Sequence, residues 1–399
     1  FVDNAHLSAP TDKQYRDLVM RYYTREQLPV YNELARAFCV CDRWHSSVPG
    51  DTWPNRSYSI TGGEGKKSPP KFIERIPSWF PFSKKLKGIE NAPIYDLKAF
   101  TRHLDNKQWR WYAHDPAILR GLDKRYRKFN VRHLSFNALN RDNFAYFDRR
   151  RVSLETRTLE AAIVGRDSFL DDAVNADPND KTGLRDVSWI DPNFIDLRVL
   201  EANSNDDHPP ADVRAGQALV LDVYEALYTS PNWEQTLFVV LYDEHGGFYD
   251  HVSPPPIGDT ALHSTLGVRV PAMVIGPRVK EVVCHELFDH TTVIKTILKR
   301  FAPDPDAAIA AMGPRVATAQ DLEVVLGDEP RSGLPDPKQI RPRVEELLSR
   351  ARDRRRAEPN KLAPASDGAG HKLEFQEFQE DYIAFAKTMR KRGLPSGQP

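Results

Sequence analysis

The sequence predicts an α/β protein in which strands and helices alternate along the chain. Two apolar segments, residues 237–242 and 268–275, have the composition of buried strands, while residues 213–228 and 290–301 carry the apolar periodicity of helices. Alternation of this kind favours a doubly wound layer, in which helices cover both faces of a mostly parallel sheet.

The segment 237–256, LFVVLYDEHGGFYDHVSPPP, carries the most chemical information. Its first six residues are consecutively apolar, as expected for a strand that is covered on both faces in a parallel sheet. Asp243 and Glu244 follow this strand, and the two glycines after His245 allow the backbone to turn both carboxylates toward one site. Because ligands of open α/β sheets bind beyond such strand ends, we expect metal-binding or acid/base groups here; a surface turn with two solvated acids is the alternative.

Further elements are expected on both sides of this segment. Residues 11–40 have helical periodicity in two pieces that Pro29 separates, and residues 194–200 form another strand candidate. Residues 62–93, rich in Gly, Pro, Lys and Ser, and the more acidic residues 171–186 are expected to be surface loops, which commonly shape the rim of an active site.

Composition bounds the class of protein. The chain has 399 residues, of which 40% are hydrophobic and 28% charged, which suits one large α/β domain with insertions or two smaller domains. Lys and Arg together number 56, as do Asp and Glu, so the global charge favours neither a nucleic acid partner nor an anionic membrane surface. Three cysteines are too few for a disulfide framework and are expected to be mostly buried thiols.

No apolar run approaches the roughly 18 residues of a transmembrane segment, and the first residues lack the charged and apolar regions of a signal peptide. We expect a main domain over residues 1–340 and a helical C-terminal tail over 341–399. The tail has aromatic and apolar residues at near-heptad spacing, which predicts docking on the domain or on a partner, including a second copy of the chain: Phe375, Phe378, Tyr382, Phe385 and Met389.

A second informative segment, CDRWHSSVPGDTWPNRSYSITG at residues 41–62, has a turn followed by a helix start at Pro54. Thr52 lies at or just before that start, where backbone N–H groups and the helix dipole stabilise an alkoxide or a phosphate. A simple N-cap is the alternative role for Thr52. Asn55 and Arg56, an amide and a cation one turn along, are candidate ligands of anionic substrate oxygens.

A third segment, EANSNDDHPPADV at residues 201–213, places His208 at the apex of a polar loop before two prolines. A lone loop histidine is commonly solvated or structural. Here it follows the strand candidate 194–200, which would bring it to the same sheet edge as Asp243.

Together these segments resemble the phosphoesterase family, which includes bacterial phospholipases C and a related acid phosphatase within the alkaline-phosphatase-like superfamily. The resemblance covers about residues 29–298. The matching pieces occur in the family's order: PVYNELARAFCVCDRWHSSVPGDTWPNR, VSWIDP, NSNDDHPPADVRAGQ, YDEHGGFYDHVSPP, GVRVPAMVIGPRV and FDHTTVIKTIL.

The resemblance implies a three-layer α/β/α sandwich with a mostly parallel central sheet, and an in-line attack on phosphorus by a hydroxyl at the position of Thr52. Asp243 and Glu244 fall on two adjacent ligands of one or more divalent metal ions. His208 falls on a histidine of the phosphate pocket that protonates the leaving oxygen, and His114 is a weaker candidate for a second such histidine. The family also suggests an exported protein.

Two departures from the family stand out. The family opens with a strand and a Glu-Asn-Arg-Ser-Phe-Asp-His-like motif whose Glu and Asn complete the metal shell, and this sequence contains no such motif. Either that segment lies outside the sequence, or the metal site is incomplete. In addition, Asp51 stands where a proline is expected before the nucleophile, and its carboxylate would repel an anionic substrate unless a cation offsets it.

The expected function is therefore metal-assisted hydrolysis of phosphoric esters, most of all phospholipase C-like cleavage of a phospholipid. Acid phosphatase activity on a small phosphate ester is the nearest alternative. A non-catalytic binding or scaffold protein with an incomplete metal shell is the alternative from another class.

Overall fold

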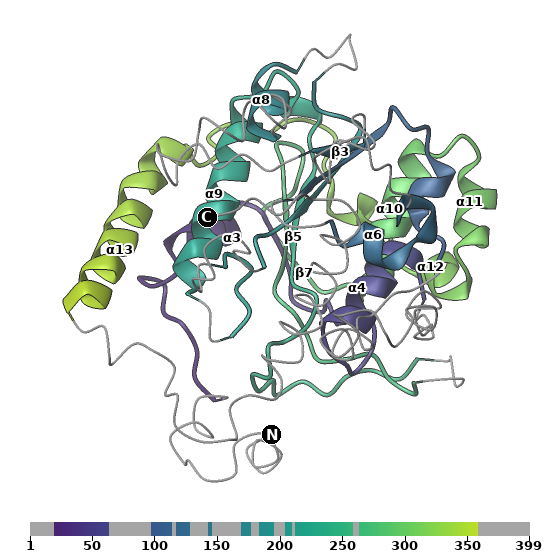
Figure 1. Ribbon diagram of the computed structural model, residues 1–399, viewed down its shortest axis with the longest axis horizontal. Helices are drawn as coiled ribbons and strands as arrows, with labels where there is room; N and C mark the ends of the chain where they lie inside the picture. The colour runs from purple at the N-terminus through teal and green to yellow at the C-terminus, as the bar shows by residue number, and fades with distance from the viewer. Residues whose placement is uncertain are drawn as a thin grey trace, which may run out of the picture.

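Helices lie on both sides of a central group of strands in the computed structural model of the chain (Figure 1). The structure describes residues 20–63, 97–113, 117–127, 143–145, 169–176, 183–194, 204–209, 212–257 and 263–357. Mixed α/β content is thus confirmed.

The described strands form two small sheets. A mixed four-stranded sheet has the order β5 (Phe238–Leu241), β6 (Ala272–Ile275), β1 (Cys39–Cys41) and β7 (Val283–Cys284), and a parallel three-stranded sheet has the order β3 (Phe144–Ala145), β2 (Trp109–Ala113) and β4 (Val187–Asp191). In the first sheet β6 is antiparallel to both β5 and β1, and only β1 and β7 are parallel among the described pairs. A single, mostly parallel central sheet is not confirmed.

Strand β5 shows why the sequence misled on direction. Its neighbour β6 runs antiparallel, with Phe238 opposite Ile275 and Leu241 opposite Ala272, so the described pairing of this strand is not the parallel one that the sequence predicted. Its apolar residues are consecutive because both faces are covered: Phe238 packs against one hydrophobic core with α9 and the β1–β6 sheet, and against another around Tyr112. Burial on two faces, and not strand direction, removed the alternation.

The helices form two groups. On one side of the strands lie α3 (Pro29–Ala37), α9 (Val213–Tyr228) and α13 (Pro337–Ala357), and on the other lie α4 (Thr52–Thr61), α10 (Thr291–Phe301), α11 (Pro305–Ala311) and α12 (Pro314–Thr318) (Figure 1). Shorter helical elements are α6 (Leu119–Leu122), α8 (Phe169–Val174), η3 (Phe100–His103), η4 (Lys124–Arg127), η6 (Trp233–Gln235) and η7 (Leu322–Val325).

Several predicted elements match. Helix α9 covers the predicted range 213–228, α10 covers all but the first residue of 290–301, and β6 is the second half of the strand expected at 268–275. Of the two helical pieces expected in 11–40, α3 forms the second, whereas the described residues 20–28 contain turns and no helix. The strand expected at 194–200 lies outside the described residues apart from Phe194.

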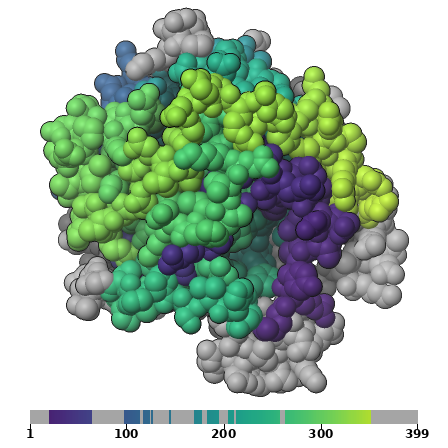
Figure 2. All heavy atoms as spheres, turned by 180° about the vertical axis from the view of Figure 1, so that it is seen from behind, coloured from purple at the N-terminus to yellow at the C-terminus, as the bar shows by residue number. Residues whose placement is uncertain are grey.

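Helix α13 connects the end of the described chain to the core. Ile340 and Val344 are buried in the same cluster as α3 and the β1–β6 sheet, and Arg341 pairs with Asp222 and Glu225 of α9. Seen from behind, the yellow-green α13 lies against the purple segment that contains α3 (Figure 2). The predicted domain boundary at 340 therefore falls inside this helix, and the rest of the tail lies outside the described residues.

The three cysteines behave as expected. Cys39, Cys41 and Cys284 are free and buried, and the Sγ atoms of Cys39 and Cys41 are 4.0 Å apart. Cys41 lies opposite Cys284 in the register of the parallel strands β1 and β7. Among the described helices, none combines the length and the apolar character that crossing a membrane requires.

Candidate active site

Helix α4 begins at Thr52, not at Pro54 as the sequence suggested. Asp51, with an extended backbone, is the N-cap residue, so Thr52 is the first helical residue and does not have the capping role that was its alternative. Its side chain is buried. A hydroxyl in this position lies at the positive end of the helix dipole, which lowers the cost of an alkoxide.

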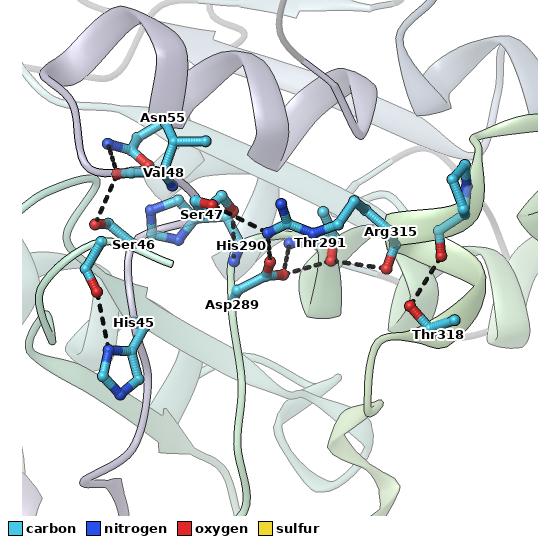
Figure 3. Close-up of polar contacts among 12 residues, drawn as sticks. His45, Ser46, Ser47, Val48, Asn55, Asp289, His290, Thr291, Arg315 and Thr318 are labelled. Carbon is cyan, nitrogen blue, oxygen red and sulfur yellow. Dashed lines mark hydrogen bonds and ion pairs between the residues drawn. The ribbon is translucent and has the colours of Figure 1, made fainter. Parts of the chain in front are cut away.

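Asn55 organises the loop that leads into this helix (Figure 3). Its Oδ1 accepts a hydrogen bond from the Val48 N–H at 3.1 Å, and its Nδ2 lies 3.0 Å from the carbonyl oxygens of Gly50 and Asp51. The residue is completely buried. Its amide therefore holds the backbone around Thr52, and these contacts differ from the substrate contact that the sequence suggested.

Replacing Asn55 with alanine should lower the free energy of unfolding by about 2–3 kcal/mol, because buried backbone groups of residues 48–51 lose their partner. It should also lower kcat, because the backbone before Thr52 is no longer fixed. Thermal unfolding and steady-state kinetics measure the two effects. Asn143→Ala is the matched control, since the buried Asn143 amide donates to Asn106 O and Trp109 O in the β2 region. If Asn55→Ala and Asn143→Ala lose the same activity per folded molecule, Asn55 has no special role in fixing the backbone before Thr52.

Arg56, one turn after Thr52, joins the helix to the end of β5. Its Nε donates to Asp243 Oδ2 at 2.9 Å, and its Nη1 lies 3.8 Å from Asp191 Oδ1. The guanidinium carbon lies 4.7 Å from the centre of the Phe194 ring. Arg56 is thus a bridge between two carboxylates from distant parts of the chain.

Asp191 is a site residue that the sequence reasoning missed. It ends β4, is 2% exposed, and its Oδ2 accepts hydrogen bonds from Trp111 Nε1 at 2.7 Å and the Ile118 N–H at 3.0 Å. Burial raises the pKa of this carboxyl, and the Arg56 cation opposes that shift. The available signal was VSWIDP, where an aspartate directly follows apolar residues of a strand.

The acidic pair after β5 has partners within the protein. Asp243 Oδ1 accepts from the Glu244 N–H at 3.1 Å, and Glu244 Oε2 accepts from the Gly246 N–H at 2.7 Å. His245 Nδ1 lies 3.3 Å from the same Glu244 oxygen. In the described ranges no group of three or more His, Cys, Asp or Glu side chains is arranged to hold a metal ion. The described donors therefore do not complete a metal shell.

His290 forms a hydrogen bond with the backbone carbonyl of Asp243. Its Nδ1 accepts from Trp44 Nε1 at 3.4 Å, so its Nε2 carries the proton and donates to the Asp243 carbonyl at 2.6 Å. Burial lowers the pKa of His290, which keeps the ring neutral. The residue is also the N-cap of α10, in agreement with its predicted place at a helix start.

A second series of polar contacts fixes the loop before Thr52 (Figure 3). Arg315 of α12 pairs with Asp289 and donates to the Ser47 carbonyl at 3.0 Å, while the Ser47 hydroxyl accepts from the His290 N–H at 3.2 Å. A cavity of about 490 Å³ lies beside Arg315 and Asp289, and none of the predicted site residues lines it.

His208 lies in a turn whose geometry defines its tautomer. Its Nδ1 is 2.8 Å from the Pro209 carbonyl, which only accepts, so Nδ1 carries a proton. The His208 N–H donates to Asp206 Oδ1 at 3.3 Å. Burial raises the pKa of Asp206 to about 6, and the nearby His208 and Arg56 oppose this shift. The charge of Arg56 therefore acts on the carboxyl group beside His208.

The structure thus connects three of the predicted segments. Arg56 contacts Asp243 directly, and Asp206 interacts with both Arg56 and His208. Arg56 joins the first of these segments to the other two, and the Tyr242 hydroxyl, which donates to Asp207, joins the other two directly. The described hydrogen bonds and ion pairs include none between Thr52 and His208. His114 lies outside the described residues.

Several known proteins have sequences similar to this chain. Two relatives from Arabidopsis thaliana are non-specific phospholipase C3, 32% identical over 83% of this chain and 59% of its own length, and non-specific phospholipase C6, 34% identical over 75% and 52%. Phospholipase C B of Mycobacterium tuberculosis is 29% identical over 71% of this chain and 52% of its own length. The chain spans little more than half the length of these relatives.

Among solved structures, an alkaline phosphatase superfamily protein from Vibrio parahaemolyticus aligns with 75% of this chain and 66% of its own, at 12% identity and a TM-score of 0.39. The profile of the Phosphoesterase family matches residues 2–302, which include every residue of the site described above except Arg315. The chain belongs to the Phosphoesterase family.

Proposed function

We propose that the protein hydrolyses phosphoric esters, and that its reaction is of the phospholipase C type. The observation that carries the proposal is Thr52, a buried hydroxyl at the first residue of α4, on the same helix as the arginine that binds Asp243. Membership of the Phosphoesterase family and relatives named phospholipase C support the same reaction.

In this proposal Thr52 Oγ1 attacks phosphorus in line with the leaving alcohol. The threonine hydroxyl gives its proton to solvent water as the new P–O bond forms, and the bond from phosphorus to the leaving oxygen breaks. The N-terminal N–H groups of α4 stabilise the developing charge. Water then attacks the phosphorylated threonine, restores the hydroxyl and releases the phosphate ester head group.

His208 is proposed as the general acid of the first step. Because Nδ1 is bound to the Pro209 carbonyl, Nε2 is the atom that gives a proton to the leaving oxygen when the ring is an imidazolium. The adjacent Asp206 carboxylate stabilises that cation. His114 stays a candidate for a second pocket histidine, on the family resemblance alone.

A divalent metal ion also belongs to the proposal on the family resemblance, with Asp243 and Glu244 as its carboxylate ligands. Since the described donors do not complete a shell, the steps above are derived from the protein's own groups. A three-layer sandwich and export from the cell have the same support. Self-association through the tail is proposed on its near-heptad apolar spacing alone.

The substrate class can be tested with two chromogenic esters, p-nitrophenyl phosphorylcholine and p-nitrophenyl phosphate, before and after treatment with EDTA. We expect hydrolysis of the diester analogue to have the higher kcat/KM, and EDTA to lower it at least about tenfold, reversibly on adding divalent cations. Metal content measured for the wild type and Asp243→Ala links the effect to the acidic pair.

Each other result has a definite meaning. Preference for the monoester would replace the phospholipase C assignment with acid phosphatase activity. Binding of phosphorylcholine without turnover of either ester would favour a binding or scaffold protein. Full activity in EDTA, with no bound metal in the wild type, would remove the metal from the proposal.

A further inference from the structure

Asp207 adopts a left-handed backbone conformation directly before His208, with φ at 59°. Among the residues that the structure describes, every other residue with positive φ is a glycine. This conformation costs a non-glycine residue about 1 kcal/mol or more, although Asp and Asn tolerate it better than other types. Such a conformation persists where the surrounding structure holds it, and commonly near functional sites.

The side chain of Asp207 explains how the conformation is held. Its Oδ2 accepts a hydrogen bond from the Tyr31 hydroxyl of α3 at 2.7 Å and a second one from the Tyr242 hydroxyl after β5. Its Oδ1 lies against Gly216 of α9, where an added Cβ would be 2.0 Å away. Two tyrosines and a glycine therefore form a close-fitting site for this carboxylate.

The same contacts connect the two halves of the candidate active site. Asp207 directly precedes His208, and Tyr242 directly precedes Asp243, so their hydrogen bond joins the neighbours of the proposed acid and of the acidic pair. A second contact joins the same segments, because a Cβ on Gly246 would lie 3.1 Å from the Pro209 ring. The distance between the His208 turn and the end of β5 is thus fixed at two points.

We infer that Asp207 is a positioning residue that, through Tyr31 and Tyr242, holds His208 where it protonates the leaving oxygen. The inference rests on the proposed function, since it gives Asp207 no contact with substrate and acts only through His208. A general acid matters most when the leaving alcohol is basic, and little when it is p-nitrophenol. Misplacement of His208 should therefore reduce turnover selectively for esters of aliphatic alcohols.

The test compares soluble dihexanoylphosphatidylcholine, which releases an aliphatic alcohol, with p-nitrophenyl phosphorylcholine. Tyr242→Phe and Asp207→Asn should lower kcat for the first substrate by about 10- to 100-fold, with a much smaller change for the second and in KM. Gly216→Ala, which pushes against Asp207, should have the same selectivity. Tyr224→Phe is the matched control, because it also removes a buried hydroxyl, one that donates to Pro335 O at 2.7 Å.

His208→Asn separates the inference from the proposed function. Selective loss in His208→Asn, Tyr242→Phe and Asp207→Asn, with none in Tyr224→Phe, supports the inference. Selective loss in His208→Asn alone would overturn it and leave the proposed function intact. Equal loss on both substrates in the Asp207 and Tyr242 variants would indicate general destabilisation and also overturn it. If His208→Asn loses activity equally on both substrates or not at all, His208 is not the general acid. The roles of His208 as the acid and of Asp207 as its positioning residue then both fail.

Discussion

Replacing Thr52 with alanine is expected to lower kcat for phosphoester hydrolysis at least about a thousand-fold. The reason is chemical: without the hydroxyl no covalent phosphoenzyme can form, and loss of a nucleophile is among the largest single effects in enzymes. Thr52→Ser keeps the hydroxyl at the first residue of α4 and should retain activity within about tenfold. Steady-state kinetics with the better chromogenic ester measures both variants.

Thr61→Ala provides the matched control on the same helix. Its hydroxyl is also buried, and it donates to Ser57 O at 2.8 Å at the opposite end of α4. That variant should lose stability of about 1 kcal/mol with little change in kcat. Mass spectrometry of acid-quenched enzyme should find the phosphoryl group on Thr52 in the wild type. Wild-type activity in Thr52→Ala would refute the nucleophile assignment.

Replacing Arg56 with methionine is expected to have the largest effect on stability. Asp191 is buried, and Arg56 is the one cation paired with it among the described residues, so its removal should cost about 3–5 kcal/mol. Denaturant unfolding measures the loss. Arg350→Met, which breaks an exposed pair with Glu346 in α13, should cost well under 1 kcal/mol.

The loss in Arg56→Met should depend on pH in a defined direction. Burial already raises the pKa of Asp191 in the folded protein, and removal of Arg56 raises it further. A carboxyl whose pKa is raised by folding destabilises the native state when it ionises, so its cost is absent below the unfolded pKa near 4 and grows as the pH rises through the folded pKa. The free energy of unfolding of Arg56→Met should be furthest below that of the wild type at pH 7–8, and the difference should shrink toward pH 5.

Addition of Asp191→Asn to Arg56→Met should restore part of the lost stability at pH 7.5, because the amide carries no charge. A loss that stays constant from pH 5 to 8, with no rescue by Asp191→Asn, would show that Arg56 acts through packing on Phe194 and not through the carboxylate.

Local sequence patterns located much of the site. Thr52 was placed at a helix start because a proline and glycine turn precedes Pro54, a residue typical of the first helical position, and Asp243 at a strand end because six apolar residues stop abruptly there. These features depend on neighbours in the chain. The strand predicted before His208 lies outside the described ranges at residues 195–200.

The partners of these residues could not be predicted from local pattern. Arg56 lies 187 residues before Asp243, and nothing in the spacing indicates that it binds this carboxylate in place of a substrate oxygen. Asp191 resembled an ordinary polar strand end, and its burial depends on Trp111 of another strand. The direction of β5 was missed for a similar reason, since burial by two cores produces the same apolar run in either orientation.

The three buried cysteines give the protein an internal probe for comparing these variants. Because Cys39, Cys41 and Cys284 are buried on two paired strands, a thiol reagent can reach them only after that part of the sheet opens. The rate of thiol labelling therefore measures opening of the core without an added dye or tag. If a variant loses activity while its cysteines are labelled at the wild-type rate, the substitution has impaired the catalytic step. If its cysteines are labelled faster, the substitution has destabilised the core.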